Sequence, residues 1–230
     1  MEVNTQPIER ISRSSHLDIV KMWQTIQGEG PMIGEPCVFI RLAGCTLMCP
    51  FCDTDYTSTR GRMSVGDLVE RVRAIRPSGL VVLTGGEPFR QNLGPAIRAL
   101  NRNGFLVQIE TNGTLFLSDL PYGKPSKLII VCSPKTPKIN QDLEQHLDAY
   151  KYIVESGAVD REDGLPTCTL GGKRPSRPRY SLTDCAQIYI QPMDEQDTKR
   201  NKLHVTAALK SCYEYGYRLC LQTQKFIGLA

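Results

Sequence analysis

The stretch Gly44-Cys45-Thr46-Leu47-Met48-Cys49-Pro50-Phe51-Cys52-Asp53-Thr54 holds three cysteines in a C-x3-C-x2-C spacing. It follows an apolar run at residues 38–42, which is typical of a buried strand. Three thiolates on one loop can hold three corners of an iron–sulfur cube, whereas a full set of protein ligands needs a fourth cysteine. No fourth cysteine follows nearby, so one iron would stay open to a small molecule. This arrangement favours chemistry at the open iron over simple electron storage.

A structural zinc site is the alternative interpretation, because closely spaced cysteines often bind zinc. Zinc would need a second pair of ligands at ribbon or finger spacing. The remaining cysteines form no C-x2-C pair; they are Cys37, Cys132, Cys168, Cys185, Cys212 and Cys220. The cysteines alone favour a cluster and leave zinc open.

The composition predicts one compact α/β domain over residues 1–230. The 40% hydrophobic and 23% charged content is ordinary for a globular protein, and a net charge of +4 does not by itself predict a nucleic-acid partner. Residues 1–15 are polar without an apolar core, and no run is long enough to span a membrane. Nine cysteines, an odd number, favour a reducing compartment. We therefore expect a cytoplasmic location.

Short apolar runs alternate with helical patterns, as in a parallel sheet. We expect strands at 37–42, 80–83, 105–109, 127–131, 150–154, 186–190 and 218–221, and helices at 64–76, 92–103 and 201–215. Residues 1–17 are predicted to be a loose or edge segment. Because helices become sparse after the first strands, a barrel smaller than the eight-fold form is expected.

Polar motifs follow several of these strands. They are T-G-G-E-P at 84–88, E-T-N-G at 110–113, S-P-K at 133–135, Q-P-M-D at 191–194 and Q-T-Q-K at 222–225. Each motif alone could be an ordinary turn. Because the carboxyl ends of parallel strands meet at one edge of the sheet, however, these motifs are expected to share the face that carries the cysteine loop.

The cysteine loop, with Phe51 just before its third cysteine, resembles that of the radical S-adenosylmethionine (SAM) enzymes. Q-T-I-Q-G-E-G at 24–30, F-I-R-L-A-G-C at 39–45 and C-D-T at 52–54 resemble the 7-carboxy-7-deazaguanine synthase family, which serves the biosynthesis of queuosine and related bases. The resemblance extends over residues 22–225. It implies a partial (trimmed) parallel β/α barrel of the radical SAM type. It also implies a lyase that converts 6-carboxy-5,6,7,8-tetrahydropterin to 7-carboxy-7-deazaguanine with release of ammonia.

The resemblance further implies a [4Fe–4S] cluster, SAM and Mg²⁺. The cluster ligands would be Cys45, Cys49 and Cys52, and the magnesium ligand would be Thr54, for which a turn or helix cap is the alternative. The residues expected to bind SAM are Phe51, Gly85, Gly86, Glu87, Asn112, Ser133, Lys135 and Gln191. No side chain is expected to be catalytic beyond these cofactors.

The residues expected to face the substrate are Gln27, Glu29, Arg41, Thr84, Glu110 and Gln224. Arg41 suits a substrate carboxylate through paired hydrogen bonds, although its stem could instead pack on the barrel rim. Many members of the family carry histidine where this chain has Gln224. Glutamine keeps hydrogen-bonding capacity but cannot carry charge.

The expected partners are the pterin, an electron donor such as flavodoxin and a second copy in a homodimer, with no membrane and no nucleic acid. An irregular, basic loop insertion is predicted at about 155–185; its cations are Lys173, Arg174, Arg177 and Arg179. A solvated loop is favoured there, because no aromatic side chains interleave with the cations. Two other functions stay open: a glycyl-radical activating enzyme, which shares the cysteine loop, and a zinc-stabilised nucleic-acid-binding module.

Overall fold

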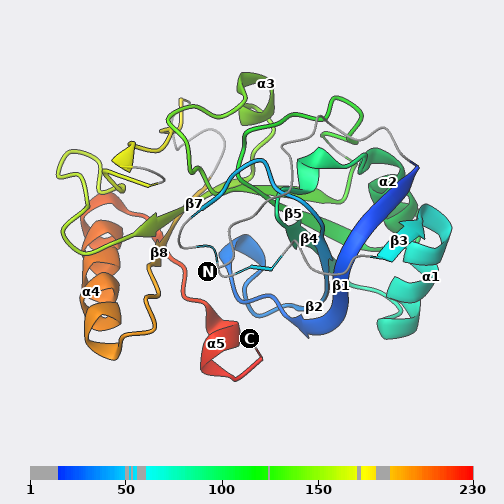
Figure 1. Ribbon diagram of the computed structural model, residues 1–230, viewed down its shortest axis with the longest axis horizontal. Coiled ribbons are helices and arrows are strands. Elements are labelled where there is room, and N and C mark those ends of the chain that lie inside the picture. The colour runs from blue at the N-terminus through cyan, green and yellow to red at the C-terminus, as the bar shows by residue number, and fades with distance from the viewer. Residues whose placement is uncertain are drawn as a thin grey trace.

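The computed structural model describes residues 15–49, 52, 54–55, 61–123, 125–169, 172–179 and 187–229. Its strands form one sheet in the order β3-β1-β2-β4-β5-β6-β7-β8-β9. Figure 1 shows this sheet curving across the molecule, with α1 and α2 at one end and α4 at the other.

Seven parallel strands form the predicted part of the sheet. They are β2 (Pro36–Leu42), β4 (Leu80–Gly85), β5 (Leu106–Thr111), β6 (Leu128–Cys132), β7 (Ala149–Val154), β8 (Gln187–Pro192) and β9 (Arg218–Leu219). Each neighbour pair from β2 to β9 is parallel. The expected trimmed parallel barrel is therefore confirmed.

Two antiparallel strands extend this sheet at its beginning. Strand β1 (His16–Ile26) pairs with β2, where Trp23 lies opposite Phe39, and with β3 (Gly61–Ser64). The prediction of a loose or edge segment up to residue 17 was wrong at its end, because Leu17 is buried and β1 lies between two other strands. Pairing between segments distant in sequence decided this, and local pattern does not encode such pairing.

The helices begin and end at recognisable caps. Helix α1 (Val65–Ile75) starts after Ser64, whose Oγ accepts a hydrogen bond from the Asp67 N–H at 3.2 Å, as a serine N-cap does. Helix α4 (Thr198–Tyr215) starts earlier than predicted, because the Asp197 side chain caps it, and ends at Gly216 in the left-handed conformation. The other helices are α2 (Gly94–Arg102) and the short α3 (Gln141–Glu144) and α5 (Thr223–Phe226).

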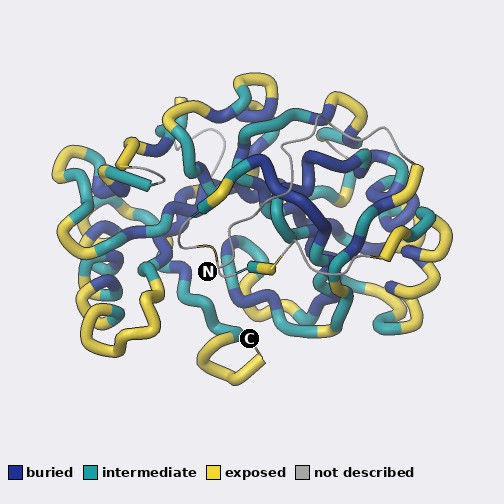
Figure 2. Tube along the Cα trace, viewed as in Figure 1, coloured by how far each residue is buried: buried dark blue, intermediate teal, exposed yellow. Residues whose placement is uncertain are grey.

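The two faces of the sheet pack in different surroundings. On β4, Val81 and Leu83 belong to the main core between the strands and the helices, whereas Leu80 and Val82 form a smaller apolar cluster on the opposite face. Figure 2 shows the buried residues concentrated along the central strands and the exposed ones in the outer loops. The opposite face is apolar at the start of the strands and becomes polar toward their carboxyl ends, where the site lies.

Acidic side chains form ion pairs with the arginines of the predicted basic loop. Arg174 lies 2.6 Å from Asp160, Arg177 lies 2.7 Å from Asp163, and Arg179 lies 3.3 Å from a carboxylate of α3. These ion pairs offset much of the positive charge that could attract nucleic acid. Among the described helices, none combines the length and the apolar character that crossing a membrane requires.

Candidate active site

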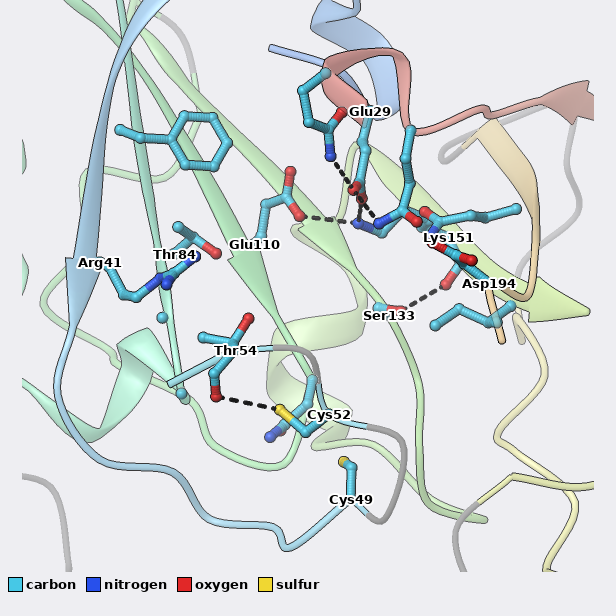
Figure 3. A pocket seen from close by; sticks show the side chains of 18 of the residues that line it. Glu29, Arg41, Cys49, Cys52, Thr54, Thr84, Glu110, Ser133, Lys151 and Asp194 are labelled. Atoms are coloured by element: carbon cyan, nitrogen blue, oxygen red, sulfur yellow. Dashed lines mark hydrogen bonds and ion pairs between the residues drawn. The ribbon is translucent and has the colours of Figure 1, made fainter. Parts of the chain in front are cut away.

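A cavity of about 610 Å³ opens at the carboxyl ends of the parallel strands (Figure 3). It brings together most of the site residues predicted from the sequence. Those that line it are Cys45, Cys49, Cys52, Thr54, Gly85, Gly86, Asn112, Ser133, Lys135, Gln191, Glu29, Arg41, Thr84, Glu110 and Gln224. Two predicted residues, Gln27 and Glu87, do not line it, and Phe51 lies outside the described residues.

The alternation of strands explains why these side chains converge. Successive side chains of a strand point to opposite faces, so Thr84 shares the inner face with Leu80 and Val82. The same alternation puts Arg41 on the inner face of β2 and Glu110 on that of β5. Arg41 lies directly opposite Thr84 in the β2–β4 register. The last inward residues of β2, β4 and β5 therefore reach the cavity.

The cysteine loop lies along one wall of this cavity. Burial raises the pKa of the Cys45 thiol to about 12 and that of Cys49 to about 11. Both are therefore protonated at neutral pH, and a bound metal would have to displace those protons. In the part of the chain that the structure describes, no three potential ligands are already gathered as a metal site. Three thiols from one loop facing one cavity nevertheless match the donor chemistry of an iron–sulfur cluster.

Cys132 is a core residue in this structure. Its side chain is buried in the main core, and a Cβ atom added to Gly113 would lie 2.6 Å from its sulfur. All eight described cysteines are free of disulfides.

The T-G-G-E-P turn packs directly on the beginning of the cysteine loop. A Cβ atom added to Gly85 would lie 2.2 Å from the Leu42 carbonyl oxygen, and one added to Gly86 would lie 2.0 Å from the Gly44 carbonyl oxygen. Only glycine allows this close approach. The backbone of the turn, rather than side chains, therefore forms this part of the cavity wall.

Glu87, expected from the sequence to bind SAM, does not line the cavity in this structure. The side chain is fully buried and accepts hydrogen bonds from the Thr111 hydroxyl and the Asn112 N–H, both at 2.7 Å. Burial raises the pKa of this carboxyl group, although the hydrogen bonds oppose the shift. Its role here is to fasten the end of β5 to the glycine turn.

Asn112 links two of the predicted motifs. Its side-chain amide donates to the Thr46 hydroxyl at 3.1 Å, and its carbonyl oxygen accepts from the Thr114 hydroxyl at 2.7 Å. The E-T-N-G motif is thereby tied to the cysteine loop. Asn112 has both the turn role and the place in the cavity wall that its sequence context allowed.

Ser133 and Lys135 form a polar corner of the cavity. The Lys135 ammonium group donates to the Ser133 hydroxyl at 2.5 Å and to the Ser133 carbonyl oxygen at 3.1 Å. Burial, with the nearby Lys151, lowers the pKa of Lys135 to about 8. A buried ammonium group in such a corner suits an anionic partner such as a carboxylate.

A buried ion-pair network forms the remaining wall. The Lys151 ammonium group of β7 donates to Glu29, and to Glu110 at 2.9 Å (Figure 3). Gln27, which was expected to face the substrate, lies behind this wall at 1% exposure and donates to Glu110 at 2.9 Å. Sequence reasoning missed Lys151. Its signal was a charged residue within the apolar run 150–154.

Gln224 reaches the same network from the C-terminal segment. Its amide nitrogen donates to Glu29 at 3.0 Å, and its buried carbonyl oxygen has no hydrogen-bond partner among the described residues. A Cβ atom added to Gly28 would lie 1.5 Å from that oxygen. The first glycine of Q-G-E-G thus leaves room for Gln224.

The sequence motifs also did not indicate that aromatic side chains line one part of the cavity. Trp23, the only tryptophan of the chain, lines the cavity with Phe39, at 5.4 Å between ring centroids. Lys21 and Arg41 lie over the Trp23 ring at 4.9 and 5.3 Å from its centroid, distances at which a cation is attracted to the ring. The cation of Arg41 is therefore supported from within the cavity wall.

Comparisons with known proteins place this cavity in context. The Radical SAM superfamily profile matches residues 39–129. A 7-carboxy-7-deazaguanine synthase from Rhodospirillum rubrum is 41% identical over 221 residues, covering 92% of this chain and 92% of the relative. The synthase from Rickettsia prowazekii is 35% identical over 225 residues, covering 93% of this chain and 88% of the relative. A solved structure titled "Crystal structure of QueE from Escherichia coli" has a similar fold, with a TM-score of 0.66 at 23% identity, covering 90% of this chain and 94% of that chain.

Proposed function

The chain belongs to the 7-carboxy-7-deazaguanine synthase family of radical SAM enzymes, and from this membership we propose that it converts 6-carboxy-5,6,7,8-tetrahydropterin to 7-carboxy-7-deazaguanine with release of ammonia. Membership implies a [4Fe–4S] cluster and SAM. When bound, these cofactors supply one-electron chemistry that begins with removal of a hydrogen atom from C6 of the pterin. The observation that carries the proposal is that the three cysteines and the Arg41 and Glu110 side chains line one cavity.

The cofactor side of the cavity is formed by the cysteine loop and the strand-end motifs. Cys45, Cys49 and Cys52 hold the cluster through their thiolates. The residues that hold SAM are the backbone of Gly85 and Gly86 and the side chains of Asn112, Ser133, Lys135 and Gln191, and Phe51 stays a candidate from the sequence. Glu87 acts on this side only by fixing the position of Asn112.

The substrate side presents the guanidinium group of Arg41 and the carboxylates of Glu29 and Glu110. The guanidinium group of Arg41 pairs with the pterin carboxylate, and Trp23 supports its position. The carboxylates of Glu29 and Glu110 accept hydrogen bonds from the N–H groups of the aminopyrimidinone ring. Thr84, next to Arg41, adds a hydroxyl to the same wall.

Mg²⁺ is the third proposed cofactor. Thr54 lines the cavity beside the cysteine loop, where a hydroxyl oxygen can serve as one ligand and substrate oxygens as others. A small protein ligand set of this kind suits magnesium, which keeps several positions for water and substrate.

The remaining partners follow from the chemistry. A one-electron reaction needs a reductant, for which a flavodoxin-type electron donor is proposed, and a homodimer in the cytoplasm is the proposed working form. Light scattering after size exclusion tests the dimer. The two rival functions lose support, because the family resemblance covers nearly the whole chain rather than the cysteine loop alone.

The direct test is anaerobic turnover of the reconstituted protein with SAM, dithionite and the carboxytetrahydropterin, read by mass spectrometry. We expect 7-carboxy-7-deazaguanine and ammonia in equal amounts. Metal analysis of the same sample should find iron and sulfide. A colourless protein with one zinc, or an iron–sulfur protein that leaves the pterin unchanged, contradicts the proposal.

A further inference from the structure

The residue with no role so far is Lys151, on the inner face of β7. Its side chain is 8% exposed, and its ammonium group bridges two carboxylates that come from distant parts of the chain. Glu29 lies in the Q-G-E-G loop and Glu110 at the end of β5. A lysine buried this far is rare unless its charge is paired, so the bridge accounts for its presence.

Each of the two carboxylates is held from both sides. One carboxylate oxygen of Glu29 accepts a hydrogen bond from the Lys151 ammonium group. The other oxygen accepts from the side-chain amides of Gln222 and Gln224, each at 3.0 Å. One carboxylate oxygen of Glu110 accepts a hydrogen bond from the Lys151 ammonium group at 2.9 Å. Its other oxygen accepts from the side-chain amides of Gln27 at 2.9 Å and Gln108 at 3.1 Å. The neutral amides orient the two groups, and Lys151 is the cation that both carboxylates share.

The electrostatics of the network depend on that shared charge. Burial lowers the pKa of Lys151, but the attraction of Glu110 and Glu29 outweighs burial and leaves the pKa well above its ordinary value. For Glu29, burial raises the pKa, but Lys151 and the hydrogen-bonded amides outweigh burial and lower the pKa to about 2. Other titratable groups that interact with this cluster are the Lys135 ammonium group and the thiols of Cys37 and Cys220.

Removing the lysine would leave two buried carboxylates side by side. Like charges in such a site cannot both stay ionised, so one of the two takes up a proton. A protonated carboxyl keeps its carbonyl oxygen as an acceptor, but its other oxygen becomes an O–H donor. That oxygen would then oppose the N–H groups of an aminopyrimidinone ring instead of binding them.

We propose that Lys151 is a positioning residue of this reaction: it keeps Glu29 and Glu110 ionised and side by side, as paired acceptors for the ring N–H groups of the substrate. The inference rests on the proposed function, because it assumes the pterin as substrate. It adds a residue that acts through the two carboxylates and contributes recognition of the ring rather than radical chemistry.

The kinetic test compares Lys151→Met with Lys151→Arg, and with Lys210→Met as a control on the exposed surface of α4. Lys151→Met should raise KM for the pterin roughly 10- to 100-fold, the worth of a lost charged hydrogen-bond partner, while kcat falls much less. Its KM should also depend on pH between roughly 5 and 8, the range of a raised carboxyl pKa. Lys151→Arg should restore most of the affinity without that pH dependence. A Lys151→Met enzyme with the KM and pH profile of Lys210→Met overturns the proposal.

The double variant Lys151→Met/Glu29→Gln separates charge from shape. It removes the unpaired carboxylate, so the pH dependence of KM should disappear although Lys151 is still missing. It also keeps the test open if Lys151→Met alone does not fold, because it buries one charge fewer. A pH dependence that persists in the double variant contradicts the shared-cation role.

A readout without turnover separates this inference from the proposed function. Infrared difference spectra of the reconstituted protein between roughly pH 5 and 8 should show a titrating carboxyl C=O band in Lys151→Met. This band adds to any contribution of the buried Glu87 carboxyl, which all three proteins share, and it should be absent from the parent and from the double variant. Absence of the band from Lys151→Met overturns the role of Lys151 even if the pterin is turned over. Its presence supports the role even if the parent proves inactive on the pterin.

Discussion

The cysteine thiols are the residues on which all the proposed chemistry depends. Replacing any one of Cys45, Cys49 or Cys52 by alanine should remove most of the iron and abolish turnover, because three ligands are the minimum set here. Cys212→Ala, at a partly buried position on α4 outside the cavity, is the matched control and should keep both. Iron content and anaerobic turnover are measured together. A Cys49→Ala protein with full iron and full SAM cleavage would remove the cluster assignment.

A single oxygen distinguishes the native side chain from valine at position 54. Thr54→Val keeps the shape and removes the proposed magnesium ligand. We expect turnover of the parent to rise with added Mg²⁺ and the variant to respond more weakly. The measurement is a Mg²⁺ titration of both proteins after treatment with a chelator. Equal curves for the two proteins would leave Thr54 as a turn residue.

Gln224 lies where the family resemblance in the sequence leads us to expect histidine. Its amide donates to Glu29 at 3.0 Å, so Gln224→Leu should lower kcat/KM by a factor on the order of 10, the worth of about one hydrogen bond. Gln224→His should be tolerated and should add a pH dependence between roughly 5.5 and 7.5. The pH–rate profiles of parent and variants decide this. A fully active Gln224→Leu with an unchanged Gln224→His profile would remove Gln224 from the site.

At the scale of an element, the C-terminal segment with α5 closes one side of the cavity. Several contacts hold it. The Thr223 N–H donates to the Gly28 carbonyl oxygen at 3.3 Å, the side-chain amides of Gln222 and Gln224 donate to Glu29, and Lys225 pairs with Asp194 at 2.6 Å. The Lys225 hydrogen bond, with the amides near it, lowers the pKa of Asp194 to about 2. The pair therefore stays ionised at neutral pH.

Lys225→Met should loosen this segment because it leaves Asp194 without its cation. We expect faster amide hydrogen exchange in residues 222–229 and a KM for the pterin a few-fold higher, since a partly exposed ion pair is worth at most about 1 kcal/mol. Hydrogen exchange read by mass spectrometry measures the first effect. Lys210→Met, in an exposed pair on α4, is the control and should change neither. Unchanged exchange in Lys225→Met would mean that the remaining contacts hold the segment without this ion pair.

At the scale of the whole molecule, the Glu29–Lys151 pair makes the unfolding free energy depend on pH. The folded pKa of Glu29 is about 2 against an ordinary value of 4.5. A lowered carboxyl pKa stabilises the fold above the ordinary value, and that stabilisation is lost as the pH falls toward the folded value. The contribution is therefore complete at neutral pH and shrinks between 4.5 and 2.

Glu29→Gln should thus lower the unfolding free energy by on the order of 3 kcal/mol at neutral pH. The difference from the parent should shrink steadily as the pH falls below about 4.5. Urea unfolding of both metal-reconstituted proteins at several pH values is the measurement. A difference that stays constant down to the acid limit would mean that the charge of Glu29 is not what stabilises the fold.

The sequence by itself determined the parallel strands, the main helices and the edge where the site lies. These features follow from local pattern: apolar runs mark buried strands, helical periodicity marks the helices, and polar motifs mark the strand ends that must meet. The spacing of the three cysteines is also local. Most predicted site residues therefore line the cavity.

Only the tertiary structure decided which polar groups face the cavity and which support it from behind. Gln27 and Glu87 lie in the predicted motifs, yet the packing of other segments buries both side chains. The place of β1 inside the sheet and the bridge from Lys151 to two distant glutamates join segments far apart in the chain. No local pattern encodes such partners, because the free energy of pairing and of burying a charge depends on what the folded chain brings beside it.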